Sequence, residues 1–98
     1  MRYTLEQGKV TFFLEGELNT LTSEDVEIEI DDVLKGQRID SIVFDMGDLI
    51  YITSAGLRIL VRLKKIYNDT RLVRVQPEVY HVLEMVGFNQ LFSIERAA

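Results

Sequence analysis

The chain has 98 residues, of which 47% are hydrophobic and 28% are charged, values typical of one globular domain. It contains no cysteine, which excludes a disulfide scaffold, a thiolate metal site and a cysteine nucleophile. No apolar run approaches the roughly 20 residues of a membrane-spanning helix, and the N-terminus lacks the apolar core of a signal peptide. We expect a soluble cytoplasmic protein that forms a single domain over residues 1–98, with no membrane span.

Charge is unevenly distributed along the chain. Residues 1–49 carry four basic and twelve acidic side chains, a net charge of −8, whereas residues 50–98 carry seven basic and four acidic side chains, a net charge of +3. An acidic chain of this kind, with a total of −5, argues against nucleic acid as a direct partner. The asymmetry favours a protein partner that contacts one face.

The chain opens with the pattern of a β-hairpin. Apolar and polar residues alternate over residues 3–5 and 10–14, on either side of Gly8. Such period-2 spacing around a glycine turn is typical of paired strands. Phe13 interrupts the alternation, so we expect the second strand to be covered on both faces.

A helix is predicted next. Thr22 followed by Asp25 resembles a capping box, with Leu21 and Val26 as a hydrophobic staple, and Gly36 is a typical C-terminal stop. The outer face of this helix is acidic. A solvated face is the simpler interpretation, and a docking face for a partner is the other.

A buried strand and a second helix follow. Ile42-Val43-Phe44 is a continuous apolar run within residues 39–46, which is typical of a central strand. We expect a loop over residues 47–53 and then a helix with Ser54 as its N-cap. One side of this helix is apolar, and the other side carries a basic set, Arg58, Arg62, Lys64 and Lys65.

The remaining elements complete an alternating order. Residues 72–75 are typical of a strand, Pro77 fits the first position of a third helix, and Gly87 ends that helix. Residues 88–94 are expected to form a buried turn and a short last strand. The order β-β-α-β-α-β-α-β predicts an α/β fold with a mixed sheet of about four to five strands covered by about three to four helices.

Ser54 is the residue best placed for a chemical modification. It is predicted where a strand-exit loop becomes a helix, and the small residues Ala55 and Gly56 follow it. Free amides and the positive end of the helix macrodipole would favour a phosphate there. The simpler interpretation is a capping serine. The functional interpretation is a phosphorylation site, where added charge and bulk would repel a partner.

Catalysis by the chain itself is not supported. A serine nucleophile needs an adjacent base, and the single histidine, His81, is predicted within the third helix. The segment Thr53–Leu57 lacks the glycine pattern of a nucleophile elbow, the six glycines form no phosphate cradle, and the acidic residues lack calcium-loop spacing. We therefore expect no enzymatic activity, no catalytic residue, no cofactor and no metal site.

Two features beside Ser54 have two interpretations each. Ile50-Tyr51-Ile52 precedes it, and these side chains either fill the core or place one or two apolar groups at the centre of a partner-binding patch. Arg58, Arg62 and Lys65 share a helix face. That face is either solvated or attracts an acidic partner surface.

Four segments together resemble one family over the whole chain. They are GELNTLTSEDVE (16–27), SIVFDMGDLIYITSAGL (41–57), the helix continuing from Arg58 to Lys65, and PEVYHVLEMVGFNQLFSI (77–94). Together they are similar to the STAS domain of the anti-sigma factor antagonist family, with 41–57 covering its central strand and signature serine turn.

The resemblance implies a bacterial regulatory protein. In the family, the unphosphorylated protein binds an anti-sigma factor that is also a serine kinase and so frees the sigma factor. The kinase then phosphorylates the antagonist, the complex dissociates, and a phosphatase resets it. Ser54 matches the phosphoacceptor position. The resemblance places these residues at or near the partner surface: Gly16, Asn19, Tyr51, Thr53, Ser54, Gly56, Leu57 and Arg58.

Three positions depart from the family pattern. Thr53 replaces an aspartate, Ala55 replaces a second serine, and Asn19 replaces an acidic residue. They favour an alternative function, a non-phosphorylated STAS scaffold or accessory subunit of a transport system. Thr53 is an alternative phosphoacceptor, and a small-ligand-binding module is a third possibility. A monomer is the default expectation, because the outer helix faces are charged.

Overall fold

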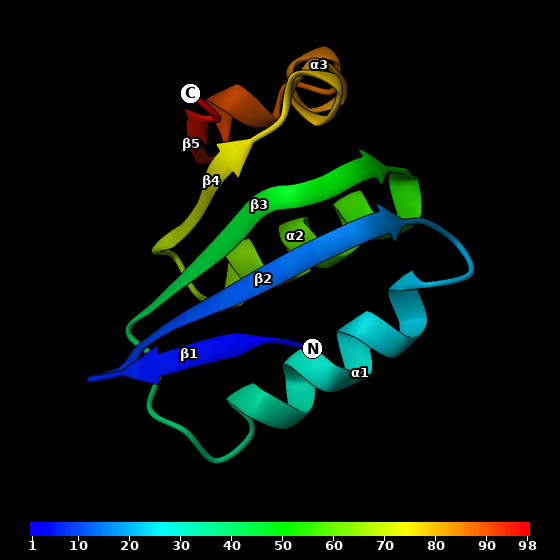
Figure 1. Ribbon diagram of the computed structural model, residues 1–98. Coiled ribbons are helices and arrows are strands. Elements are labelled where there is room, and N and C mark those ends of the chain that lie inside the picture. Colours follow the sequence, from blue (N-terminus) through cyan, green and yellow to red (C-terminus); the bar gives the residue numbers. More distant parts are fainter.

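The computed structural model describes residues 1–98 as a five-stranded mixed sheet with three α-helices and one short 3₁₀ helix, η1 (Figure 1). This confirms the predicted fold class and element order. The elements are β1 (Tyr3–Glu6), β2 (Lys9–Leu18), α1 (Ser23–Leu34), β3 (Ser41–Ile52), α2 (Ser54–Ile66), β4 (Thr70–Val75), α3 (Pro77–Met85), η1 (Phe88–Gln90) and β5 (Ser93–Arg96). No helix has the length and apolar character needed to cross a membrane.

The strands lie in the sheet in chain order, from β1 to β5. β1 and β2 are antiparallel, as the predicted hairpin requires, and all later neighbours are parallel. Each parallel pair is joined by a helical crossover, which is the usual way to connect parallel strands. The carboxyl ends of β2 and β3 therefore meet at one edge of the sheet, where Leu18 pairs with Ile52.

The hydrophobic core lies between one face of the sheet and the helices. Alternate residues of β2 and β3 are fully buried on that face, and Phe12 stacks on Phe44 with ring centroids 5.7 Å apart. On the other face, Phe13 is half-buried beneath the guanidinium of Arg2, 4.2 Å from its ring. We expected β2 to be covered on both faces. At Phe13 the second face is covered by the side chain of Arg2.

The predicted loop over residues 47–53 is wrong, because β3 continues to Ile52. Leu49 and Ile52 are buried and anchor this half of the strand, while β2 accommodates it with two register shifts. Pairing of β3 with β4 extends only to Asp45, whose carboxylate binds Arg74. Beyond that point, β2 alone supplies the backbone partners of β3.

The start of α1 also differs from its prediction. No capping box forms, because the hydroxyl of Thr22 donates to the carbonyl of Glu17 at 2.8 Å instead of capping the helix. The side-chain oxygen of Asn19 accepts the amides of Leu21 at 2.9 Å and Thr22 at 3.1 Å. Leu21 is 88% exposed, which excludes the predicted hydrophobic staple. Asn19 therefore organises the turn that leads into α1.

Three predicted helix boundaries are confirmed. Gly36 and Gly87 follow α1 and α3 with φ angles of +71° and +81°, in the left-handed region where glycine is favoured. Pro77 is the first residue of α3. These short-range signals depend on backbone geometry alone, which explains why they were readable from the sequence.

Candidate functional site

Ser54 is the first residue of α2, at the edge where β2 and β3 end. The prediction that it is the N-cap is wrong: Thr53 occupies that position, with extended backbone angles of φ −113° and ψ −179°. The hydroxyl of Thr53 lies 3.5 Å from the carbonyl oxygen of Leu18 and does not cap the helix. Ser54 is exposed and its hydroxyl makes no hydrogen bond within the chain. The side chain is therefore accessible at the positive end of α2.

Gly56 allows α2 to pack closely against the sheet. It is buried, and a β-carbon at this position would lie 2.7 Å from Leu18 Cγ and 2.8 Å from Ile52 Cγ1. Gly56 was predicted to lie at or near the partner surface, and its burial leaves it beneath that surface rather than on it. Its role is to hold the start of α2, and with it Ser54, against the end of the sheet.

Several other predicted residues lie at or next to the end of the β2–β3 pair, after which α2 begins. Glu17 pairs with Tyr51, and Gly16, which is exposed, pairs with Leu49. Tyr51 is 46% exposed. Asn19 and Thr53 are half-buried, and their polar atoms are directed to the chain itself.

The apolar run before Ser54 divides between core and surface. Ile52 is buried, whereas Ile50 is 61% exposed and lies beside the exposed Tyr51. Ile50 and Tyr51 are therefore exposed apolar side chains, which the second interpretation of this run requires.

The basic face of α2 is not uniform. Arg62 donates to Glu27 at 2.7 Å and to Asp31 at 2.8 Å, so it joins α2 to α1. Its pKa is raised above the ordinary arginine value by the hydrogen bond to Asp31, against the opposing effect of burial, with Glu27 adding to the rise. Arg58 is exposed and makes no ion pair. Two acidic side chains of α1, Glu27 and Asp31, are thus already engaged in ion pairs within the chain.

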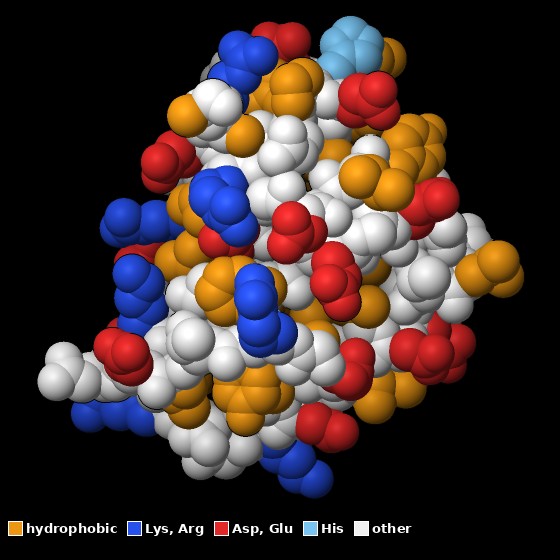
Figure 2. Space-filling view, in the orientation of Figure 1, with side chains coloured by type: hydrophobic (Ala, Val, Ile, Leu, Met, Phe, Trp, Pro, Cys, Tyr) orange, Lys and Arg blue, Asp and Glu red, His pale blue; other side chains and the backbone are white.

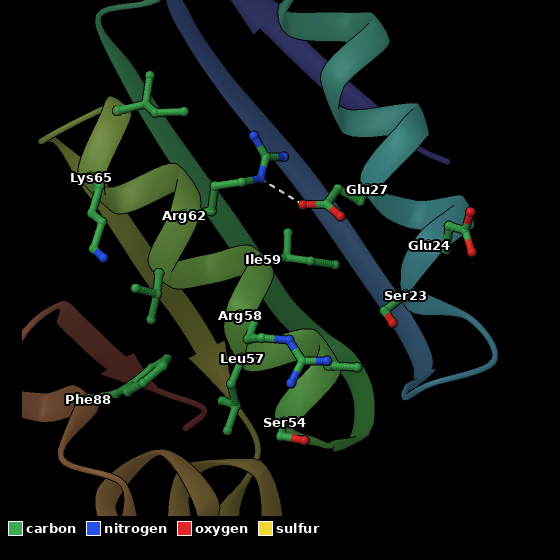
Figure 3. A pocket seen from close by; sticks show the side chains of 13 residues that line it. Ser23, Glu24, Glu27, Ser54, Leu57, Arg58, Ile59, Arg62, Lys65 and Phe88 are labelled. Carbon is green, nitrogen blue, oxygen red and sulfur yellow. Dashed lines mark hydrogen bonds and ion pairs between the residues drawn. The ribbon is translucent and has the colours of Figure 1, made fainter.

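A groove of about 890 Å³ follows α2 from Ser54 to Ile66, with α1 on one side and Phe88 of η1 on the other (Figure 3). Ser54, Leu57 and Arg58 all line it. Ser23 and Phe88 also line it but were not singled out from the sequence, because their positions depend on how α1 and η1 pack. His81, the single histidine, is exposed on α3 and does not line this groove.

Acidic and basic side chains are unevenly distributed on the face of the molecule that Figure 2 shows. Figure 2 shows acidic side chains predominating on the side of the molecule where α1 begins and basic side chains predominating on the opposite side.

The family model of the STAS domain matches residues 3–97. The chain belongs to the STAS domain family. Within it, the chain is 33% identical over 101 residues to BtrV of Bordetella bronchiseptica, which carries the provisional name of an anti-sigma factor antagonist. That match covers 96% of this chain and 85% of BtrV. The anti-sigma F factor antagonist of Paenibacillus polymyxa is 26% identical over 92 residues, covering 90% of this chain and 79% of that protein.

Solved STAS structures share the fold. The unphosphorylated anti-sigma factor antagonist SpoIIAA, from Bacillus, superposes with a TM-score of 0.77 at 19% identity, over 95% of this chain and 87% of SpoIIAA. A sulfate transporter family protein from Wolinella succinogenes superposes with a TM-score of 0.75 at 15% identity, over 94% of this chain and 80% of that one. The same STAS fold thus occurs in proteins of both regulatory and transport families.

Proposed function

We propose that this protein is a cytoplasmic anti-sigma factor antagonist that binds an anti-sigma factor with serine-kinase activity. Phosphorylation of Ser54 by that kinase ends the binding, and a phosphatase restores it. The observation that carries this proposal is the exposed hydroxyl of Ser54 at the first position of α2, in the family's signature turn. The resemblance of the chain to antagonists from Bordetella bronchiseptica and Paenibacillus polymyxa supports it.

The site is suited to being modified rather than to catalysing. A phosphoserine carries a charge of about −1.5 to −2 at neutral pH. The start of a helix tolerates such a charge, so the modified protein remains folded. The exposed Ile50 and Tyr51 precede the phosphorylated residue by four and three positions in the chain. Its charge and bulk would then prevent a partner from covering this apolar patch.

Two of the departures from the family pattern are compatible with this switch. Asn19 accepts two backbone amides through its side-chain oxygen, a role that a carboxylate oxygen would also fill. Ala55 is almost fully buried, so a missing hydroxyl there removes nothing from the exposed surface. Ser54 keeps the exposed hydroxyl that the reaction needs.

The proposal is tested by incubating the protein with its cognate kinase, ATP and Mg²⁺ and locating phosphate by mass spectrometry. We expect one phosphate, on Ser54, and none on a Ser54→Ala variant. Phosphate on Thr53 instead would move the switch to the neighbouring residue. An unmodified protein, with a kinase that is active on another substrate, would contradict the proposal.

A STAS scaffold or accessory subunit of a transport system is the second candidate. Thr53 favours it, because its hydroxyl is directed to Leu18 and cannot replace the carboxylate that the family usually has there. The shared fold with the Wolinella succinogenes protein is consistent with it. This candidate predicts that a Ser54→Asp variant binds its partner as tightly as the wild type, whereas the regulatory function predicts a clear loss of affinity.

A further inference from the structure

Helices α1 and α2 form a layer whose two halves carry opposite charges. α1 contains six acidic residues and no basic one, whereas α2 contains four basic residues and no acidic one. The two helices lie side by side (Figure 3). They run in the same direction, because each connects neighbouring parallel strands of the sheet. An acidic helix and a basic helix are therefore aligned along one side of the molecule.

Part of this charge is used within the chain. Arg62 pairs with Glu27 at 2.7 Å and with Asp31 at 2.8 Å. Glu29 pairs with the amino terminus at 2.8 Å, and Lys64 donates to a backbone carbonyl. The remaining charged side chains of the layer are exposed and make no ion pair: Glu24, Asp25 and Asp32 on α1, and Arg58 and Lys65 on α2. These charges are available to a partner.

Each helix also presents an apolar side chain between its free charges. Ile28 of α1 is 53% exposed, and Glu24 and Asp32 lie four residues before and after it, the spacing of one helix face. On α2 the half-buried Val61 lies between the two free basic residues. The acidic stripe is therefore Glu24, Ile28 and Asp32, and the basic stripe is Arg58, Val61 and Lys65.

A second copy of this chain matches both stripes at once. Around a twofold axis parallel to the helices, α1 of one copy lies along α2 of the other, and the same contact recurs by symmetry. Ile28 then packs against Val61 of the second copy. Asp32 meets Lys65 in the last turns of the helices, and the charges at the helix starts meet in the same way. A foreign partner would have to carry the same two stripes, whereas a second copy supplies them by symmetry.

We infer that two copies of this protein associate through their α1–α2 layers as a weak homodimer. The expectation of a monomer assumed that charged outer faces keep copies apart, which holds only for faces of like sign. Helices of 12 and 13 residues are about 18–20 Å long, and two of them about 10 Å apart form a patch smaller than the roughly 800 Å² per partner of a standard interface. The dimer is therefore transient, and added salt weakens it. Because Ser54 lines the groove along α2, the dimer competes with a partner that docks there.

The dimer is tested by sedimentation equilibrium at low salt, at chain concentrations from about 10 μM to about 1 mM, the range of weak association. We expect the average mass of the wild type to rise toward that of two chains. Asp32→Lys and Lys65→Glu should each weaken association about tenfold or more, because two symmetry-related contacts change from attraction to repulsion. An equimolar mixture of these two variants should associate again, because both contacts of the mixed dimer join opposite charges.

Glu84→Lys is the matched control. Glu84 is an exposed acidic residue near the end of α3, outside the α1–α2 layer, and it makes no ion pair. We expect this variant to associate like the wild type. A wild type that stays a single chain at about 1 mM, a mixture no heavier than its two components, or an equal loss in Glu84→Lys would overturn the inference. Masses beyond two chains would also overturn it, because a twofold contact closes on itself.

Discussion

Gly56 and Ser54 lie two positions apart but serve different purposes. Gly56 is pressed against Leu18 and Ile52, where no side chain fits, whereas Ser54 faces outward at the same turn. The glycine determines where α2 begins relative to the sheet. The serine depends on that placement, since a displaced helix would move its hydroxyl relative to the ends of β2 and β3.

A Gly56→Ala substitution tests this packing. The added methyl group would meet atoms of Leu18 and Ile52 at less than 3.0 Å, and such overpacking costs about 1–3 kcal/mol. We expect this loss in the free energy of unfolding, measured by urea denaturation. The control is Ser54→Ala at the exposed neighbouring position, which should change stability by less than about 0.5 kcal/mol. Equal stability of the two variants would show that the close approach is not needed.

Sequence patterns predicted part of this site correctly. The exposure of Ser54 followed from its place between a strand and a helix, but its exact position did not, because Thr53 takes the N-cap without using its side chain. Ser23 could not be identified as a groove residue, since its burial depends on where α1 packs against α2. Local signals locate helix ends to within a residue or two, whereas grooves depend on tertiary packing.

At the scale of elements, β3 carries the largest difference between prediction and structure. Gly47 and Asp48 are typical loop residues, and they suggested that the strand ends at Met46. Pairing with β2 continues nonetheless to Ile52, because Leu49 and Ile52 are buried and β2 bulges to keep in register. A long-range partner overrides local propensity here. The extended strand places the exposed Ile50 and Tyr51 in β3, four and three residues before Ser54.

Arg62 provides the test at this scale, because it connects α1 and α2 through Glu27 and Asp31. A double-mutant cycle between Arg62→Ala and Glu27→Ala should give a coupling energy of about 0.5–1 kcal/mol, the upper range for partly exposed pairs. The coupling should decrease at high salt. Replacing Arg58 in the same cycle should give no coupling with Glu27. A negligible Arg62–Glu27 coupling would mean that packing alone holds the two helices together.

For the whole molecule, the order of elements was predictable because each short apolar pattern agreed with its neighbours. A hairpin followed by alternating helices and strands allows few arrangements, and right-handed crossovers reduce them further. The charge asymmetry was predictable in the same way, since it depends only on composition along the chain. The sequence does not show which of these charges remain free for a partner. That depends on the ion pairs that form in the folded chain.

The proposed switch at Ser54 is tested most directly by adding ATP and Mg²⁺ to a preformed complex of this protein with the proposed kinase and following dissociation by light scattering. We predict that the wild-type complex dissociates as phosphate is incorporated, whereas the complex of the Ser54→Ala variant persists. Wild-type and variant complexes that dissociate at the same rate, or a wild-type complex that remains intact after stoichiometric phosphorylation, would contradict the account.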